Sequence, residues 1–513
     1  MTSIDSWIEA HARFTPDKAA IRFEAGDLTY AQFAAAIGGA AHWLARAHGI
    51  GRGDRVAFLG TNAPDMLVLL FAAARLGAIL VPLNWRLAPP ELAHAVRDSG
   101  AALLVHQPAF AATVAEMAVL GAAPRVQMSD ARSGGLAAFL AGTAALSAGE
   151  GEGGAEDPLL IVYTSGTTGR PKGAVLTQRA LTANALNALH MHDMTSRDLV
   201  LTVLPMFHVG GLNIQTTPAL YAGATVLLHE RFHPESCLEA IAGERPDLTV
   251  LVPATLSALI AHPRWSDADL SSLRAIATGS SDVPRHLMQA FCERGVPVIQ
   301  IYGSTETGPV AIYQRVQDAA EEFGAIGRPG LHTEARITRD GEPLGVGEIG
   351  EIELRGTNIT QGYWNRPEAR TESFRAGGWF RTGDLGSIDA RGVFWFRDRL
   401  KNVIISGGEN IYPAELERVL GELSQVAEAA VVGVKDPQWG ECPVAVVVAR
   451  APQERDAQAV LEGFNGRLAR YKHPKSVVFV EELPRNALGK VRLDRVRNMA
   501  EDALASGTET KEA

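Results

Sequence analysis

Short apolar runs alternate with longer amphipathic segments from about residue 20 to residue 300, and no other pattern limits the possible folds as much. Apolar runs of this length, separated by helical patterns, are typical of parallel sheets with covering helices. The sequence therefore predicts an α/β fold built of doubly covered sheets. The runs include residues 55–59, 79–82, 102–106, 199–204, 225–228, 249–253 and 298–301.

The pattern changes past residue 325. Strand candidates separated by glycines at 334–338, 350–355 and 393–397 predict a small antiparallel or barrel-like section. A short αβ block follows from about residue 402. A chain of 513 residues also exceeds what one hydrophobic core usually supports, so we expect two or more domains.

Composition and charge exclude several kinds of protein. With 46% hydrophobic and 21% charged residues, the chain is typical of a globular protein. A net charge of −10 argues against nucleic acid as the main partner, because phosphate neutralisation needs a basic face. The most apolar stretch, residues 66–83, is interrupted by Arg75 and Gly77. It predicts a buried helix followed by a strand, and no integral membrane association.

The cysteines and the first residues predict a cytoplasmic protein. Cys237, Cys292 and Cys442 are widely spaced and form no CxxC pair, so neither a zinc site nor a disulfide framework is indicated. Residues 1–5 show no basic region followed by an apolar one, so we expect no secretory signal.

Residues 163–173 carry the densest chemical signal and read YTSGTTGRPKG. Three glycines let the backbone approach a ligand closely, and hydroxyls, backbone N–H groups and a lysine suit a polyphosphate. The string is not a Walker A loop, because its spacing differs and no Ser or Thr follows the lysine. The alternative is a surface turn rich in Gly, Ser and Thr. The candidate phosphate contacts are Thr164, Ser165, Gly166, Thr167, Thr168, Gly169 and Lys172.

This string closely resembles the phosphate-binding loop of the adenylate-forming superfamily, which contains acyl-CoA synthetases, luciferases and the adenylation domains of peptide synthetases. The resemblance extends from residues 28–30 to residues 489–490, and it is strongest to acid–CoA ligases with fatty or aromatic acid substrates. It implies an N-terminal AMP-binding domain over residues 1–400 and a smaller, mobile α+β lid over residues 401–513.

A second string, YGSTET at residues 302–307, follows the apolar run 298–301. Tyr302 offers a flat face for a purine, and Thr305 can donate to the α-phosphate. Glu306 supplies a hard oxygen ligand for Mg²⁺, which normally takes one or two carboxylates plus substrate phosphates. Alone the string could be a turn. Together with the phosphate loop, it resembles the family's adenine, adenylate and magnesium positions.

Two further segments resemble the parts of the family site that hold the nucleoside. Residues 277–281 read ATGSS and resemble the segment whose backbone borders the adenine, with Gly279, Ser280 and Ser281 as candidates. The family usually has Gly-Gly-Ala-Pro there, so we expect a backbone role. Asp384 follows a tight turn and can accept hydrogen bonds from ribose hydroxyls, helped by Arg399. The alternative for Asp384 is a turn cap.

The resemblance also assigns residues of the lid. Lys401 falls at the hinge position, although a solvated charge run is the other meaning of its surroundings. Gly408 lies in the string IISGGENIYP, which lines the pantetheine tunnel in the family. Lys490 ends the string PRNALGK and matches the lysine that bridges the acid and the α-phosphate. A lysine on a flexible stem suits that reach.

Two candidates have equally good alternatives. By resemblance, His208 in PMFHVGG lies at the wall of the acyl pocket, but it could be a core histidine. Trp439 matches a position that packs on pantetheine in some aryl-CoA ligases, but it could be a buried structural tryptophan.

The motifs favour an ATP-dependent acid–CoA ligase that forms an acyl-adenylate and then an acyl-CoA thioester. Such catalysis is mainly positioning and charge neutralisation. The implied ligands are ATP, Mg²⁺, coenzyme A and a fatty or aromatic (cinnamate- or benzoate-like) acid, and a homodimer is possible. The alternatives are an adenylation enzyme that loads a carrier-protein phosphopantetheine thiol and a catalytically silent nucleotide-binding relative.

Overall fold

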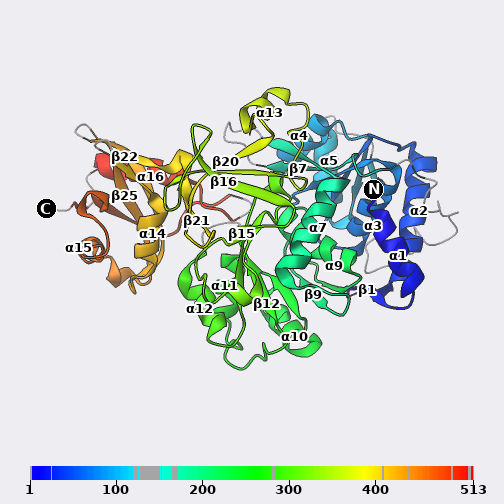
Figure 1. The fold of residues 1–513 in the computed structure, drawn as a ribbon, viewed down its shortest axis with the longest axis horizontal. Helices are drawn as coiled ribbons and strands as arrows, with labels where there is room; N and C mark the ends of the chain where they lie inside the picture. Colours follow the sequence, from blue (N-terminus) through cyan, green and yellow to red (C-terminus); the bar gives the residue numbers. More distant parts are fainter. Residues whose placement is uncertain are drawn as a thin grey trace. The chain divides into compact units, whose positions relative to one another are not determined.

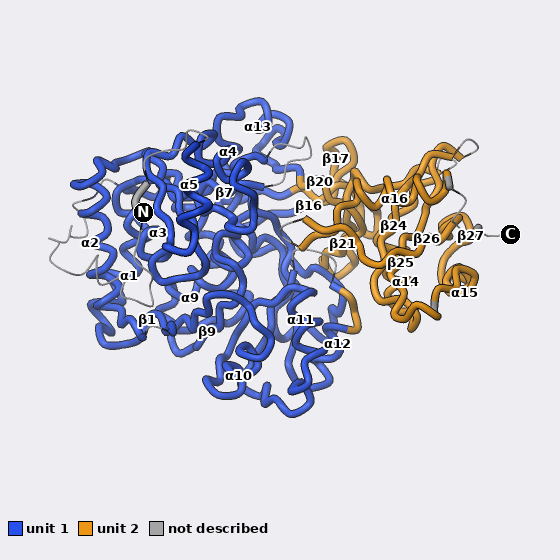
Figure 2. The backbone as a smooth tube through the Cα atoms, turned by 180° about the vertical axis from the view of Figure 1, so that it is seen from behind, with its two compact units in different colours: residues 1–283, 287–335, 354–381 blue, residues 284–286, 336–353, 382–513 orange. Residues whose placement is uncertain are grey.

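The protein is described by a computed structural model covering residues 3–24, 26–119, 125–127, 151, 153–164, 171–279, 283–406, 409–436, 439–486, 489–506 and 510–511. The described chain packs as two compact units, which Figure 2 colours separately. Unit 1 holds residues 1–283, 287–335 and 354–381. Unit 2 holds residues 284–286, 336–353 and 382–513.

Within its described residues, unit 1 contains a sheet of six strands in the order β6-β5-β3-β4-β7-β8. Neighbouring strands from β6 to β7 run parallel, and β8 forms an antiparallel hairpin with β7. The strands are β6 (Arg125–Gln127), β5 (Leu103–His106), β3 (Arg55–Leu59), β4 (Ile79–Leu83), β7 (Pro158–Thr164) and β8 (Lys172–Thr177).

A second sheet, also in the described part of unit 1, has nine strands in the order β15-β14-β13-β12-β11-β9-β10-β1-β2. The strands from β13 to β1 in this order are parallel. They are β15 (Arg328–Pro329), β14 (Ile312–Tyr313), β13 (Val298–Tyr302), β12 (Ala275–Thr278), β11 (Leu248–Val250), β9 (Leu199–Thr202), β10 (Thr225–Leu228), β1 (Ala19–Arg22) and β2 (Leu28–Thr29).

The two sheets of unit 1 share a hydrophobic core. Along β3, Val56 and Phe58 enter this shared core, whereas Ala57 and Leu59 enter a core on the other face. Along the strands of the second sheet, successive side chains also alternate between the shared core and a core on the other face. Side chains alternate across a strand, so each sheet is covered on both faces. The doubly covered sheets are therefore as predicted, and they give unit 1 an αβαβα arrangement.

The covering helices of unit 1 form the other layers (Figure 1). The shared core contains residues of α1 (Asp5–Phe14), α2 (Tyr30–His48), α3 (Pro64–Leu76), α7 (Gln178–His192) and α9 (Thr217–Ala222). Helices α4 (Pro89–Ser99) and α5 (Ala111–Val119) cover the outer face of the first sheet. Helices α10 (Pro234–Glu244), α11 (Pro253–Ile260) and α12 (Arg285–Cys292) cover that of the second.

Unit 2 contains strands on either side of the short helix η6 (Leu400–Asn402). Before it, β20 (Trp379–Ile388) pairs antiparallel with β21 (Phe394–Arg399), and β16 (Thr333–Arg339), β17 (Glu342–Pro343) and β18 (Gly350–Gly356) contribute further strand residues. After it, a sheet of the described strands β22 to β27 is covered on one face by α14 and α15 and on the other by α16. These elements are β22 (Ile404–Ser406), β23 (Glu409–Ile411), α14 (Pro413–Gly421), β24 (Val426–Asp436), β25 (Gly440–Ala449), α15 (Ala457–Glu462), β26 (Ser476–Val480), α16 (Leu493–Ser506) and β27 (Thr510–Lys511).

The elements confirm the predicted α/β class, with a large N-terminal part and a smaller C-terminal part of strands and helices. Residues 66–83 form most of α3 followed by β4, as expected from Arg75 and Gly77. No helix among the described residues is long and apolar enough to cross a membrane. The domain boundary after residue 400 and the mobility of the lid stay predictions.

A buried ion pair ties α1 to α3. Arg75 Nε lies 2.8 Å from Asp5 Oδ2, and the two side chains are only 2% and 7% exposed. Arg75 Nη2 also lies 2.5 Å from Glu9 Oε1. We expect Arg75→Ala to lower the free energy of unfolding by about 3–5 kcal/mol, because it leaves the buried carboxylate of Asp5 uncompensated. Calorimetric unfolding of wild type and variant measures the loss.

The matched control is Arg264→Ala, which removes an ion pair with Glu239 whose side chains are about half exposed. Exposed pairs of this kind contribute little to stability. Equal effects of the two substitutions would contradict a stabilising role for the buried pair.

Candidate active site

The carboxyl ends of parallel strands in the second sheet carry several of the predicted site residues. Strands β12 and β13 are parallel neighbours, and Gly279 follows the first while Tyr302 ends the second. A Cβ on Gly279 would lie 2.5 Å from the carbonyl oxygen of Ile301, so only glycine allows this approach. Ligands of open α/β sheets bind beyond the carboxyl ends of the strands. Ser280 and Ser281 lie outside the described residues.

The turn after β13 presents a carboxylate. Residues Thr305–Thr307 form the short helix η4, in which Thr305 is buried and Glu306 is half-buried. The Ser304 N–H donates to Thr307 Oγ1 at 2.8 Å and closes the turn. A Cβ on Gly303 would lie 1.8 Å from the carbonyl oxygen of Pro309, so the chain can fold back only with glycine there. Tyr302 is half-buried.

Four buried amides hold this turn in place. Asn358 Nδ2 donates to Thr307 O at 2.8 Å, and Asn213 Nδ2 donates to Gly308 O at 3.2 Å. Asn184 of α7 accepts from Val310 N at 2.8 Å and donates to Asn213 O at 2.6 Å. Asn187, one helical turn further along α7, donates to Val310 O at 2.9 Å. These hydrogen bonds fix the backbone that follows Glu306, from Thr307 to Val310.

The predicted phosphate loop begins and ends in a β-hairpin. Thr164 at the end of β7 pairs with Lys172 at the start of β8, and Thr164 Oγ1 lies 3.4 Å from Lys172 O. Both side chains are half-buried. Ser165, Gly166, Thr167, Thr168 and Gly169 lie outside the described residues, so their phosphate contacts stay predictions.

Tyr363 joins the phosphate-loop hairpin to the Glu306 turn. Its hydroxyl donates to Glu306 Oε1 at 2.9 Å, and Lys172 Nζ lies 5.5 Å from the centroid of its ring. Burial and the negative charge of Glu306 raise the pKa of Tyr363, so the phenol keeps its proton. A cation over an aromatic face is attracted to it. Lys172 and Glu306 therefore face the same side chain.

The backbone around Tyr363 makes the same link. Thr360 N donates to Glu306 O at 2.7 Å, and Thr360 Oγ1 donates to Val175 O of β8 at 2.7 Å. Trp364 N donates to Gly173 O at 2.8 Å. Sequence analysis did not single out residues 360–364; their available signal was an aromatic pair directly after a glycine. We call this segment the clamp.

His208 precedes the short helix α8 (Val209–Gly211). Its Nδ1 accepts from Gly210 N at 3.0 Å, so this nitrogen carries no proton. The side chain is half-buried, which differs from a histidine enclosed in the core. Its place at the wall of an acyl pocket stays a prediction.

Asp384 and Arg399 are cross-strand partners in unit 2. Arg399 Nε lies 3.5 Å from Asp384 Oδ1. Gly383 adopts a left-handed backbone, and its N–H donates to Glu351 Oε1 at 3.2 Å. Asp384 thus lies within strand β20, directly after a left-handed glycine and beside a cation, and not at a tight turn. Ribose binding by Asp384 stays a prediction.

Lys490 follows a left-handed glycine, Gly489, in a turn closed by Asn486. The Lys490 N–H donates to Asn486 Oδ1 at 3.0 Å, and the Asn486 N–H donates to Lys490 O at 2.9 Å. The lysine side chain is exposed. Lys401 lies in η6, where desolvation and the charge of Arg399 lower its pKa.

Trp439 is exposed and not a buried structural residue. It is 43% exposed, and Lys475 Nζ lies 5.3 Å from its ring centroid. The backbone N–H of Trp439 donates to Asp436 Oδ1 at 2.8 Å. Pantetheine binding by Trp439 stays a prediction. Gly408 lies outside the described residues.

The predicted residues divide between the units. Unit 1 contains Thr164, Lys172, His208, Gly279, Tyr302, Thr305 and Glu306, and unit 2 contains Asp384, Arg399, Lys401, Trp439 and Lys490. In unit 1 a carboxylate and a lysine converge on the clamp. Glu306 fits a Mg²⁺ ligand, because an ionised carboxylate has about four lone-pair sites and one hydrogen bond leaves others available.

The fold and the candidate site are those expected of an α/β protein that binds a nucleotide. The chain belongs to the AMP-binding enzyme family: it matches "AMP-binding enzyme" over residues 8–364 and "AMP-binding enzyme C-terminal domain" over residues 415–490. The prediction of an AMP-forming acid–CoA ligase is confirmed, and similar solved structures hold ATP, one of them together with a magnesium ion.

Similar proteins cover almost the whole chain. Indoleacetate–CoA ligase of Aromatoleum aromaticum is 49% identical over 97% of this chain and 98% of its own length. Feruloyl-CoA synthase of an Amycolatopsis species is 43% identical over 96% of this chain and 98% of its own length. The crystal structure of ATP-bound MatB from Rhodopseudomonas palustris is 32% identical, with a TM-score of 0.88 over 98% of this chain and 99% of that one.

The clamp gives a testable prediction. We expect Tyr363→Phe to slow ATP–pyrophosphate exchange by about ten- to a hundredfold, because a hydrogen bond to a charged group contributes roughly 1.5–3 kcal/mol. The Mg²⁺ concentration for half-maximal exchange should rise, because Glu306 loses the partner that orients it. Calorimetric binding of Mg²⁺–ATP gives a second readout.

Tyr30→Phe is the matched control, because the Tyr30 hydroxyl donates to Ala224 O at 2.7 Å in the core. It should reduce stability without changing the Mg²⁺ requirement. An unchanged Mg²⁺ requirement in Tyr363→Phe would remove the clamp from the site.

Proposed function

We propose that this protein activates an aromatic carboxylic acid with ATP and transfers the acyl group to coenzyme A. The observation that carries the nucleotide step is the convergence of Lys172 and Glu306 on Tyr363. This arrangement supports the binding of a polyphosphate beside a carboxylate that can hold Mg²⁺. The choice of an aromatic acid is supported by the two relatives above, which are named for indoleacetate and feruloyl groups.

The reaction has two half-reactions. In the first, a carboxylate oxygen of the acid attacks the α-phosphorus of ATP, and pyrophosphate leaves. In the second, the sulfur of coenzyme A attacks the acyl carbon, the thiol proton is released, and AMP leaves with the bridging oxygen. Activation is needed because a thiol cannot readily expel an oxide from a carboxylate.

Residues of this chain have distinct tasks in the first half-reaction. Lys172 and the N–H groups of its loop neutralise the phosphates. Thr305 donates to the α-phosphate, and Glu306, oriented by Tyr363, would hold Mg²⁺, which would supply positive charge to the phosphate oxygens. Lys490 bridges the acid and the α-phosphate from a flexible stem. Asp384, with Arg399 beside it, accepts from the ribose hydroxyls.

The substrate class is tested with a panel of acids. Release of AMP is measured with ATP, Mg²⁺ and coenzyme A for indole-3-acetate, 4-hydroxycinnamate, benzoate, octanoate, palmitate and malonate. We expect the aromatic acids to give the highest kcat/KM. A higher value for a fatty acid would contradict the aromatic proposal and leave the ligase class intact.

The thiol acceptor is tested in the same assay. Stimulation of AMP release by free coenzyme A supports a CoA ligase, whereas stimulation only by a phosphopantetheinylated carrier protein would support the alternative. Absence of ATP–pyrophosphate exchange with every acid would support a silent nucleotide-binding relative.

Lys490 gives a prediction that separates the half-reactions. We expect Lys490→Ala to reduce adenylate formation by at least about a hundredfold, because it removes a positive charge that stabilises the transition state of this step. Thioester formation from supplied acyl-adenylate should be nearly unchanged. Rapid-quench measurement of each half-reaction gives the two rates.

Lys435→Ala is the control, because Lys435 is an exposed lysine of the same unit, on β24. It should leave both rates unchanged. Equal losses of both half-reactions in Lys490→Ala would contradict the assignment.

A homodimer and a cytoplasmic location also stay proposals. The proposal of a cytoplasmic location rests on the three cysteines, which are free thiols in the structure. Light scattering in solution tests the dimer, and fractionation of cells tests the location.

A further inference from the structure

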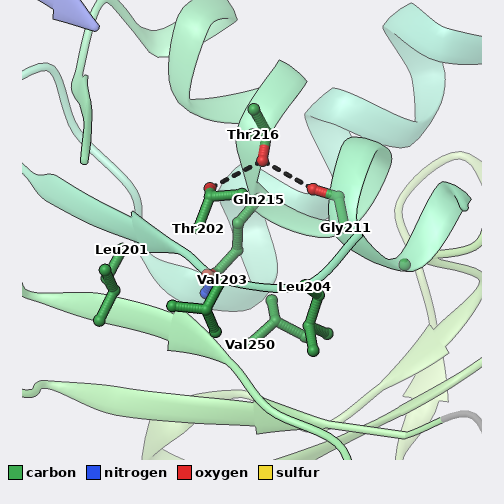
Figure 3. Close-up of a pocket in the computed structure, with 9 residues that line it drawn as sticks. Leu201, Thr202, Val203, Leu204, Gly211, Gln215, Thr216 and Val250 are labelled. Carbon is green, nitrogen blue, oxygen red and sulfur yellow. Dashed lines mark hydrogen bonds between the residues drawn. The ribbon is translucent and has the colours of Figure 1, made fainter. Parts of the chain in front are cut away.

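Unit 1 contains a small cavity beside β9 and the π-helical turn η3 (Leu212–Thr216), which follows His208 (Figure 3). The cavity has room for about one water molecule, so neither a nucleotide nor an acid fits there. Thr202 and Thr216, which line it, pair through their hydroxyls at 2.8 Å. A polar contact that reaches the phosphate-loop hairpin lies elsewhere, at Asp98 on the outer face of the six-stranded sheet.

Asp98, near the C-terminal end of α4, joins two segments of the candidate site. The Tyr163 hydroxyl donates to Asp98 Oδ2 at 2.8 Å, and Arg366 Nη2 donates to Asp98 Oδ1 at 3.2 Å. The Asp98 side chain is only 14% exposed. Hydrogen bonds that involve a charged group are roughly twice as strong as neutral ones. Each oxygen of this carboxylate therefore holds one donor in place.

Tyr163 belongs to the phosphate-loop hairpin. It pairs across the hairpin with Gly173, the residue after Lys172. A Cβ on Gly173 would lie 3.4 Å from Cζ of Tyr163 and 3.6 Å from Cβ of Trp364, so both aromatic residues lie against this glycine. Burial and the hydrogen bond to Asp98 raise the pKa of Tyr163, so its hydroxyl keeps the proton that it donates. The position of the Tyr163 ring thus bears on the position of Lys172.

Arg366 closes the turn that follows Tyr363 of the clamp. The backbone N–H of Arg366 donates to Tyr363 O at 3.2 Å, and the two residues form an antiparallel β-bridge. Tyr363 in turn donates to Glu306. The carboxylate of Asp98 therefore supports both the hairpin that carries Lys172 and the turn that orients Tyr363.

We infer that Asp98 is a positioning residue for the nucleotide step of the reaction. By holding Tyr163 and Arg366, it keeps the phosphate-loop hairpin and the clamp at a fixed separation. Lys172 and Glu306 are then held at the spacing that ATP requires. This inference rests on the proposed function, because it takes these two residues as nucleotide-binding residues.

The test separates KM from kcat, because a purely structural role would change only the amount of active enzyme. An asparagine has one oxygen where aspartate has two, so in Asp98→Asn one of the two donors loses its acceptor. We expect the KM for ATP in ATP–pyrophosphate exchange to rise about tenfold, since residues that orient direct ligands typically contribute this much or more. The calorimetric Kd for ATP should rise equally, and the KM for the acid should be unchanged.

A second variant removes one of the two contacts alone. Tyr163→Phe keeps the ring against Gly173 and lacks only the hydroxyl. It should raise the same two constants, and the double variant should resemble Asp98→Asn alone, because both substitutions break one network. Multiplied effects in the double variant would overturn the inference, because they would show that the two residues act independently.

Asp157→Asn is the matched control. Asp157 directly precedes β7, at the opposite end of this strand from the phosphate loop, and its carboxylate accepts from Arg52 Nε at 3.1 Å and from Gly154 N at 2.9 Å. It should lower stability and leave both constants for ATP unchanged. Unchanged constants in Asp98→Asn, or a loss of kcat alone, would overturn only the inference about Asp98. Absence of ATP–pyrophosphate exchange in wild type would overturn the proposed function, and with it this inference.

Discussion

The hydrogen bond from Tyr363 to Glu306 connects parts of unit 1 that come from different sheets. Glu306 follows a strand of the nine-stranded sheet, and Lys172 begins a strand of the six-stranded one. The clamp lies against both through its backbone and through the tyrosine ring. Tyr363 thus contacts both the Lys172 amine and the Glu306 carboxylate. The rest of the site depends on keeping these two charged groups near one another without a direct ion pair between them.

The shared core gives that arrangement its rigidity. Both sheets bury one face in it, and α7 crosses it with amides that reach the Glu306 turn. Close-packed interiors deform little, so the hairpin of the phosphate loop and the turn keep their separation. The π-helical turn is tied to the same network through Asn213. The turn that follows His208 and the turn that carries Glu306 therefore share one framework.

Much of the fold of unit 1 could be predicted from the sequence, because its strands are short, apolar and regularly spaced. Runs such as 55–59 and 298–301 correspond to β3 and β13, since buried parallel strands need apolar residues on both faces. The phosphate-loop ends and the Glu306 turn were found as strings, because their residues are consecutive. Tyr363 was not found, because it contacts Glu306, which lies 57 residues away along the chain. Such contacts leave no periodic or local signal.

The order of strands in the nine-stranded sheet also bears on how the chain is made. Strand β1 forms its parallel ladder with β10, so Ile21 must meet Val226. At usual synthesis rates, a partner roughly 200 residues away reaches the ribosome exit about 10–40 seconds later. During that interval the nascent N-terminus has an apolar strand with one edge unpaired. Chaperone protection early in translation is the expected cost of pairing β1, which lies next to the edge strand β2, with a strand that is made much later.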